Sequence, residues 1–376
     1  MPQDEEGLWM LVDKQEQMLR TSNRNVADEE LLGYLRDLTC RTLGGRCGEL
    51  RPYVIRAPGF NAFMMPNGAM FIHTGLLLRV GDEAELAAVL GHEASHFFRK
   101  HSVERLRRWS KTASRLTVLN SIVAAAGGID PDSAGAASSA LQVAGVMAGF
   151  QLLAYNRDQE RQADEDGIHW MTENGMDAAG APRIWRKLIA EQEAGGKDAG
   201  FSLLATHPAP KERLNYLSAI AGSSGRSAGG SGQDAVPEVA PPASTRILEL
   251  IGPRRMEWIG DELEAQAPKQ FAAILEAQSG FGIDGGMRYY LEARSWIKHA
   301  DRQRRGAVEA LRAADAALMA GEDAADSMPA EAWREWAKVS LRLGKPAAAR
   351  SRFEKYLDLA PDAWDARFIR RELERL

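Results

Sequence analysis

The sequence predicts an α+β fold, in which a mainly helical domain with a small β-sheet is followed by an all-α domain. The run 82–90 has acidic residues in its first turn and good helix formers after it, and Leu86, Val89, Leu90 and Phe97 recur at helical spacing, which indicates a helix in the first domain. A stretch rich in Gly, Ser and Pro at 222–244 predicts a flexible linker. Beyond it the chain reads helical throughout, which predicts the second domain.

Length and composition agree with this organisation. A chain of 376 residues with 45% hydrophobic residues is long enough for two or three domains with cores of their own. Its net charge of -5 and pI of about 5.9 argue against nucleic-acid binding.

This helical pattern includes the motif H-E-x-x-H, formed by His92, Glu93 and His96. Residues four apart share one helix face, so the two imidazoles can bind one metal ion. Glu93 is offset around the helix and can act on a metal-bound water. Two His, a third ligand and an open position describe a hydrolytic zinc site, whereas the plainer alternative is a pair of surface histidines.

The third ligand is expected downstream, in the stretch Tyr155–Asp164. Glu160 and Asp164 are again four apart on a probable helix. One carboxylate can bind zinc, and the other can accept the second N–H of a ligating His and fix its tautomer. By itself this stretch would be an ordinary solvated helix face.

Five ordered segments resemble the M48 metallopeptidases, gluzincins with a Glu third ligand, and most of all their bacterial periplasmic branch with a C-terminal tetratricopeptide (TPR) domain. The segments are Asn61–Gly68, Phe71–Leu77, Glu85–His101, Arg157–Asp164 and Thr206–Arg213. Asn156 stands where the family pattern usually has Ser. The resemblance implies a zincin-like protease domain with a small sheet and one Zn²⁺ per chain.

The resemblance also assigns roles to residues. It implies that His92, His96 and Glu160 bind zinc, that Glu93 is the general base, and that Asp164 and Arg213 support the ligands from behind. His207 would lie near the metal, as an inhibitory fourth ligand or as a catalytic donor to the oxyanion; the alternative is an ordinary loop His. His101, five residues after His96 and off the ligand face, is expected to be structural.

The substrate is expected to be an unfolded polypeptide, held as an added strand along an edge strand at 69–76. The residues of that strand named for this role are Met70, Phe71, Ile72 and His73.

The expected domains are N-terminal helices (1–50), the protease domain (51–221), the linker (222–245) and a TPR-like domain (246–376). The segment Pro329–Asp362 fits one 34-residue TPR, apart from Ser340, and an ordinary helical bundle is the alternative. The helical domain is expected to bind partners, among them outer-membrane assembly machinery. Residues 99–155, a basic run followed by an uncharged stretch, predict helices that cover the site or touch a membrane surface.

No signal peptide is visible, so a periplasmic or outer-membrane-associated location rests on the resemblance alone. Cys40 and Cys47 could form a local disulfide or remain two buried thiols. The function expected is a zinc endopeptidase for unfolded or misassembled proteins in envelope quality control. A chaperone or scaffold on the same fold is the second reading, and a zinc hydrolase of small molecules is the third.

Overall fold

A computed structural model describes residues 3–104, 155–195, 210–227, 245–278, 283–303, 306–324 and 328–376. The chain divides into two compact units. The first comprises Met1–Ala190 with Phe201–Trp258, and the second comprises Glu191–Gly200 with Ile259–Leu376. The predicted α+β class is confirmed, because the first unit holds a small sheet among helices and the second is helical in its described part.

The sheet of the first unit has three strands in the order β1-β3-β2. They are β1 (Arg51–Ile55), β2 (Ala62–Met64) and β3 (Ala69–His73), with β1 parallel and β2 antiparallel to β3. Gly68 makes the tight turn into β3. Its φ is +90°, and an added Cβ would lie 2.2 Å from the carbonyl oxygen of Glu49, so only Gly fits there.

The strand at 69–73 is therefore central, and the expectation that it is an edge strand is wrong. It pairs with β1 on one side and with β2 on the other, which leaves its backbone groups no room for a substrate. Residues 24–26 cover the outer side of β1, since Val26 donates to the carbonyl of Val54. Within the described ranges no further strand pairs with the outer side of β2.

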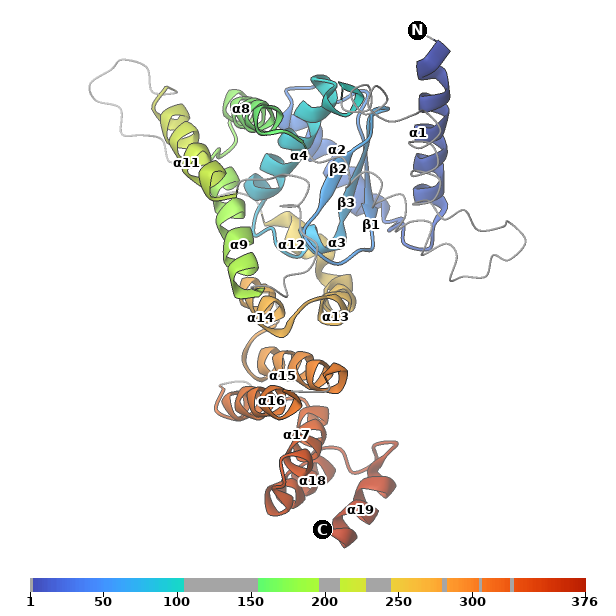
Figure 1. Cartoon of the computed structure of the whole chain (residues 1–376), viewed down its shortest axis with the longest axis vertical. Helices are drawn as coiled ribbons and strands as arrows, with labels where there is room; N and C mark the ends of the chain where they lie inside the picture. Colours follow the sequence, from blue (N-terminus) through green and yellow to red (C-terminus); the bar gives the residue numbers. More distant parts are fainter. Residues whose placement is uncertain are drawn as a thin grey trace. The chain divides into compact units, whose positions relative to one another are not determined.

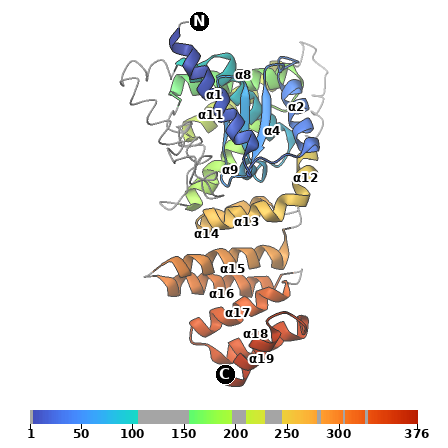
Figure 2. The same ribbon diagram turned by 90° about the vertical axis from the view of Figure 1, so that its right-hand side faces the viewer.

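Helices cover both faces of this sheet. Figures 1 and 2 show α1 across one face, with α2 and α4 on the other. Residues such as Leu19 and Phe71 form the apolar layer beneath α1. The helical elements of the first unit are α1 (Gln3–Thr21), α2 (Glu29–Thr42), α3 (Thr74–Leu77), α4 (Glu83–Phe98), α8 (Arg157–Glu173), α9 (Gly180–Gly195), α11 (Pro210–Ser227), α12 (Arg246–Ile251) and a 3-10 turn (Gly252–Arg254).

The sequence marks the start of the two helices that carry the zinc motifs. Asp82 caps α4 by accepting a hydrogen bond from the backbone N–H of Glu85. Asn156 caps α8 in a reciprocal capping box with Gln159. Asn therefore serves where the family pattern usually has Ser, because its side-chain oxygen accepts the same backbone hydrogen bond.

Cys40 and Cys47 form a disulfide between the end of α2 and the loop before β1. The expected linker begins later than predicted, because α11 remains helical through Ser227. Residues 228–244, the rest of that stretch, lie outside the described residues. The compact units divide after Trp258, so α12 belongs with the first unit.

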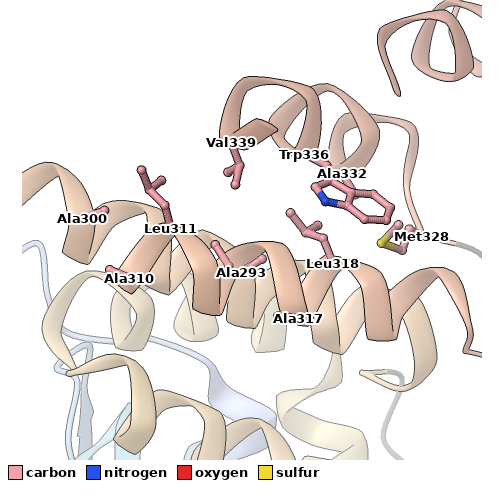
Figure 3. Packing of buried hydrophobic residues seen from close by; sticks show 11 residues of the cluster. Ala293, Ala300, Ala310, Leu311, Ala317, Leu318, Met328, Ala332, Trp336 and Val339 are labelled. Carbon is pink, nitrogen blue, oxygen red and sulfur yellow. The ribbon is translucent and has the colours of Figure 1, made fainter. Parts of the chain in front are cut away.

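The second unit is built from helical hairpins. Its helices are α13 (Arg255–Ala265, which begins in the first unit), α14 (Pro268–Ala277), α15 (Gly285–Arg302), α16 (Ala307–Glu322), α17 (Ala330–Arg342), α18 (Pro346–Leu359) and α19 (Ala366–Arg375). Figure 3 shows how Leu311, Leu318 and Trp336 pack between α15, α16 and α17. The α17–α18 hairpin lies within the predicted TPR segment, and Gly344 at its turn has a φ of +72°.

In the described part of the chain, no helix combines the length and apolarity needed to cross a membrane.

Candidate metal centre

Helices α4 and α8, which carry the two sequence motifs, cross in close contact. Gly91 and Gly167 face each other there, and a Cβ built on Gly167 would lie 3.1 Å from the backbone nitrogen of His92. Two glycines without side chains let the helix backbones approach. Since Gly167 is seven residues after Glu160, the same face of α8 carries that carboxylate toward α4.

The structure groups His92, His96 and Glu160 as a possible metal site. The two Nε2 atoms lie 3.1 Å apart. Glu160 oxygens lie 3.5 Å from Nε2 of His92 and 3.6 Å from Nε2 of His96. A tetrahedral zinc ion about 2.0–2.1 Å from each donor needs donors roughly 3.3 Å apart. The observed spacings fit that requirement.

The charge of the buried cluster also fits a divalent cation. Glu93, Glu160 and Asp164 are at most 4% exposed, and the nearest buried cation is Arg213, at 6%. With neutral imidazoles, three carboxylates and one guanidinium leave a formal charge of -2. Burying that charge without a counterion would be costly, and Zn²⁺ would balance it.

His92 is supported by a carboxylate. Its Nδ1 lies 2.9 Å from Oδ1 of Asp164, so Nδ1–H donates to Asp164 and Nε2 keeps its lone pair for a metal. Burial lowers the pKa of His92, which favours the neutral ring that a metal ligand requires. Arg213 donates to both oxygens of Asp164, and Trp185 lies 3.9 Å beneath its guanidinium.

His96 is supported differently. Its Nδ1 lies 2.9 Å from Nδ1 of His101, whose Nε2 lies 3.1 Å from Oε1 of Gln162. Tyr155 stacks on the His96 ring, with centroids 3.6 Å apart, and its hydroxyl is 2.9 Å from that of Ser102. The stacking of Tyr155 holds the face of the His96 ring, and the hydrogen bond to His101 holds its Nδ1 edge.

Glu93 is 1% exposed and lines a small cavity of about 30 Å³ beside His92. The rest of the lining is mostly apolar, with side chains of Phe60, Ile184, Trp185 and Leu217 among it. A buried carboxylate next to the three candidate donors, in a mostly apolar setting, has the position that a general base would need if a metal were held there.

The contact of His101 with His96 did not follow from the sequence, because the spacing rule that placed His101 off the ligand face assumes a continuous helix. Helix α4 ends at Phe98, and Lys100 then adopts a φ of +57°, a left-handed conformation. This turn carries His101 back toward His96. Tyr155 and Trp185 were also missed; the position of Tyr155 directly before the α8 motif was the one available signal.

Seven of the residues named from the sequence lie in or beside this centre. His92, Glu93, His96, Glu160, Asp164 and Arg213 lie together, and His101 contacts them. His207 lies outside the described residues, as does most of the 99–155 segment, from 105 to 154.

Residues 48–221 match Peptidase family M48. The matched segment contains both α4 and α8, the helices that carry the donor set. The resemblance stated from the motifs is thereby confirmed.

The chain is similar to bacterial proteins and to eukaryotic proteins named as mitochondrial. The chain is 30% identical, over 52% of its length and 40% of the relative's, to a putative beta-barrel assembly-enhancing protease of Vibrio cholerae. It is 33% identical, over 44% of each chain, to the mitochondrial metalloendopeptidase OMA1 of Schizosaccharomyces pombe. It is 27% identical, over 56% of its length and 39% of the relative's, to human OMA1. The chain therefore spans less than half the length of these relatives.

Proposed function

We propose that this protein is a zinc-dependent endopeptidase that cleaves unfolded or misassembled polypeptides. The observation that carries the proposal is the donor set of His92, His96 and Glu160 at tetrahedral spacing, with Glu93 buried beside it. The M48 match, and the word metalloendopeptidase or protease in the names of the relatives, support the same activity.

The chain's own residues have separable tasks in this reaction. His92, His96 and Glu160 would hold the zinc, which supplies Lewis acidity and lowers the pKa of a bound water to about 7. Glu93 accepts the proton of the attacking water and returns it to the leaving amine. Asp164, fixed by Arg213, holds the tautomer of His92.

The substrate strand belongs on β2 rather than on β3. The backbone N–H of Met65 donates to the carbonyl of Ala69, and that of His73 donates to the carbonyl of Asn61. The backbone N–H and C=O groups of the odd-numbered residues along β2 therefore point toward β3. The backbone groups of Ala62 and Met64 therefore point to the outer side. An extended peptide can pair there, next to Phe60, which lines the cavity that holds Glu93.

Main-chain pairing accepts many sequences but requires an extended segment, which a folded protein rarely offers. This requirement favours misfolded or loop-exposed substrates over native ones. It also disfavours a hydrolase of small molecules, because a sheet edge gives such a substrate nothing to pair with.

We further propose an envelope location and a partner-binding role for the helical unit. The beta-barrel assembly-enhancing proteases among the relatives support an envelope setting, whereas the OMA1 relatives are mitochondrial. The Cys40–Cys47 disulfide favours an oxidising compartment. The α17–α18 hairpin, with buried Ala337, Ala349 and Phe353, supports a TPR-like surface for partners such as outer-membrane assembly machinery.

The experiment is cleavage of casein by the purified protein, measured as isolated, after chelation and after zinc is restored. We expect cleavage that chelation abolishes and zinc recovers, with a folded protein of similar size left intact. Suppressed aggregation of an unfolded client, without cleavage in the zinc-loaded state, would instead support the chaperone reading.

A further inference from the structure

The metal ligand His96 has a hydrogen-bonded support that the catalytic scheme does not use. We propose that His101 and Gln162 form a neutral relay that fixes the tautomer and the ring orientation of His96 for metal binding. His101 is then a positioning residue of the metal centre. This inference rests on the proposed zinc site, but not on the substrate or on proteolysis.

The donor and acceptor in each hydrogen bond follow from one requirement, which is that the nitrogen that binds the metal must carry a free lone pair. Nε2 of His96 lies 3.1 Å from Nε2 of His92 and 3.6 Å from Glu160, so this nitrogen faces the metal position. Its lone pair must be free, and the proton of a neutral ring must then sit on Nδ1.

The next bond fixes the second imidazole in turn. Nδ1–H of His96 points at Nδ1 of His101, 2.9 Å away, and that nitrogen must accept. The proton of neutral His101 then sits on Nε2, which donates across 3.1 Å to Oε1 of Gln162. Each donor in this chain meets an acceptor. The reverse tautomer of His101 would set two N–H groups against each other, and the reverse tautomer of His96 would set two lone pairs against each other and place an N–H at the metal position.

The backbone is shaped to make this contact. Lys100 adopts a left-handed φ of +57° although it is not Gly, a conformation that residues with a Cβ adopt at an energetic cost. It is the one positive-φ residue other than glycine in the described part of the chain. The turn buries His101 to 2% exposure against His96. A surface turn with no task would have little reason to keep this strain.

The two supports differ in charge, and this difference matters for the centre. Asp164 gives His92 an anionic acceptor, whose charge Arg213 offsets. His101 and Gln162 give His96 a neutral acceptor. The formal charge of the metal-free cluster thus stays at -2, matched to one divalent ion. A second anionic acceptor would leave one charge unbalanced.

The test measures zinc affinity by competition with a coloured chelator, on the full chain. His101→Phe keeps a ring of similar size but removes both nitrogens, and we expect zinc binding to weaken by about 10- to 100-fold. His101→Asn can place its amide oxygen where Nδ1 lies, and we expect binding within about threefold of wild type. His169→Gln removes an exposed His on α8 and should change nothing.

The absorption spectrum of the cobalt-substituted protein gives a second measurement. We expect the His101→Phe bands to shift, because a reoriented His96 changes the geometry around the ion, and the His101→Asn bands to stay. A folded His101→Phe protein with wild-type affinity and spectrum would overturn the relay and return His101 to simple packing.

Gln162 keeps the proposal testable if His101→Phe does not fold. Gln162→Leu, on the partly exposed face of α8, removes only the last acceptor, and we expect about a tenfold loss of zinc affinity. Unchanged affinity would contradict the relay. A wild-type protein that binds zinc tightly but cleaves nothing would sink the peptidase proposal and leave the relay standing, so the two failures are distinguishable.

Discussion

Arg213 and Asp164 form a buried, bidentate ion pair next to His92, one of the three candidate metal ligands. Nε of Arg213 donates to Oδ2 of Asp164 at 2.9 Å, and Nη2 donates to Oδ1 at 2.6 Å. Oδ1 is also the acceptor for His92. The planar fork of Arg matches a carboxylate in this geometry, which Lys would not. Arg213, on α11, therefore holds the carboxylate of Asp164 in place, and that carboxylate in turn orients His92 on α4.

This arrangement gives a pH-dependent prediction. Burial alone would raise the pKa of Asp164, but Arg213 and His92 lower it to about 2, against about 3.9 in an unfolded chain. The lowered pKa stabilises the fold above about pH 4, and this contribution is lost as the pH falls toward 2. Its size is about 2–3 kcal/mol.

Urea unfolding of metal-free wild type and Asp164→Asn checks this prediction. We expect the gap between their unfolding free energies to narrow steadily from about pH 4 downward. A gap that stays constant over that range would mean that Asp164 does not titrate as its contacts indicate.

The ligand set predicts metal stoichiometry. We expect about one zinc per chain, most of it lost in Glu160→Ala and nearly all in His92→Ala, because each loses a donor at tetrahedral spacing. Elemental analysis after dialysis measures the content. Glu165→Ala, on α8 but outside the donor set, is the matched control. Full occupancy in Glu160→Ala would remove Glu160 from the ligands.

Glu93→Gln separates binding from chemistry. The amide keeps the size and polarity of the side chain but removes the base, so we expect retained zinc and fold with casein cleavage reduced by at least about 100-fold. Metal analysis on the same sample is the control. Comparable turnover in the variant would show that Glu93 is not the base.

The glycine contact between α4 and α8 predicts an effect at a distance from the ligands. Ala generally stabilises a helix relative to Gly by up to about 1 kcal/mol. In Gly167→Ala the new methyl group would crowd the backbone of His92, at 3.1 Å, and push the donor helices apart. We expect lower stability and weaker zinc binding, since metal sites tolerate shifts of only about 0.2 Å.

Gly33→Ala provides the matched comparison for this crossing. Gly33 lies in α2 with no atom within 4 Å of an added Cβ. We expect that variant to be neutral or more stable, with unchanged zinc affinity. Equal behaviour of the two variants in thermal unfolding and chelator competition would show that the helix crossing is not tightly packed.

Removal of the His207 side chain distinguishes two roles for it, an inhibitory ligand of the metal and a catalytic donor. As an inhibitory fourth ligand, its removal should raise basal cleavage of casein, because the open position becomes available to water and substrate. As an oxyanion donor, its removal should lower turnover roughly 10²- to 10³-fold. The inhibitory outcome is the one we expect from His207→Ala assayed beside wild type. Unchanged activity would make it an ordinary loop residue.

The sequence alone determined which side chains could form the donor set, because local spacing is enough to predict it. His92 and His96 share a face wherever that stretch is helical, and Glu160 and Asp164 do so on theirs. The caps at Asp82 and Asn156 likewise act over three residues. Linker composition and helical periodicity separated the second unit, although its start shifted to beyond Trp258.

Only the tertiary structure decided which strand has a free edge and which side chains hydrogen-bond to His92 and His96. Strand order depends on long-range pairing, so a buried apolar run such as 69–73 reads the same at an edge or in the centre. His101 reaches His96 through one left-handed residue, Lys100, which no periodicity reveals. The approach of Gly91 to Gly167 likewise depends on two helices that are distant in sequence, because packing, unlike spacing, is a property of the folded chain.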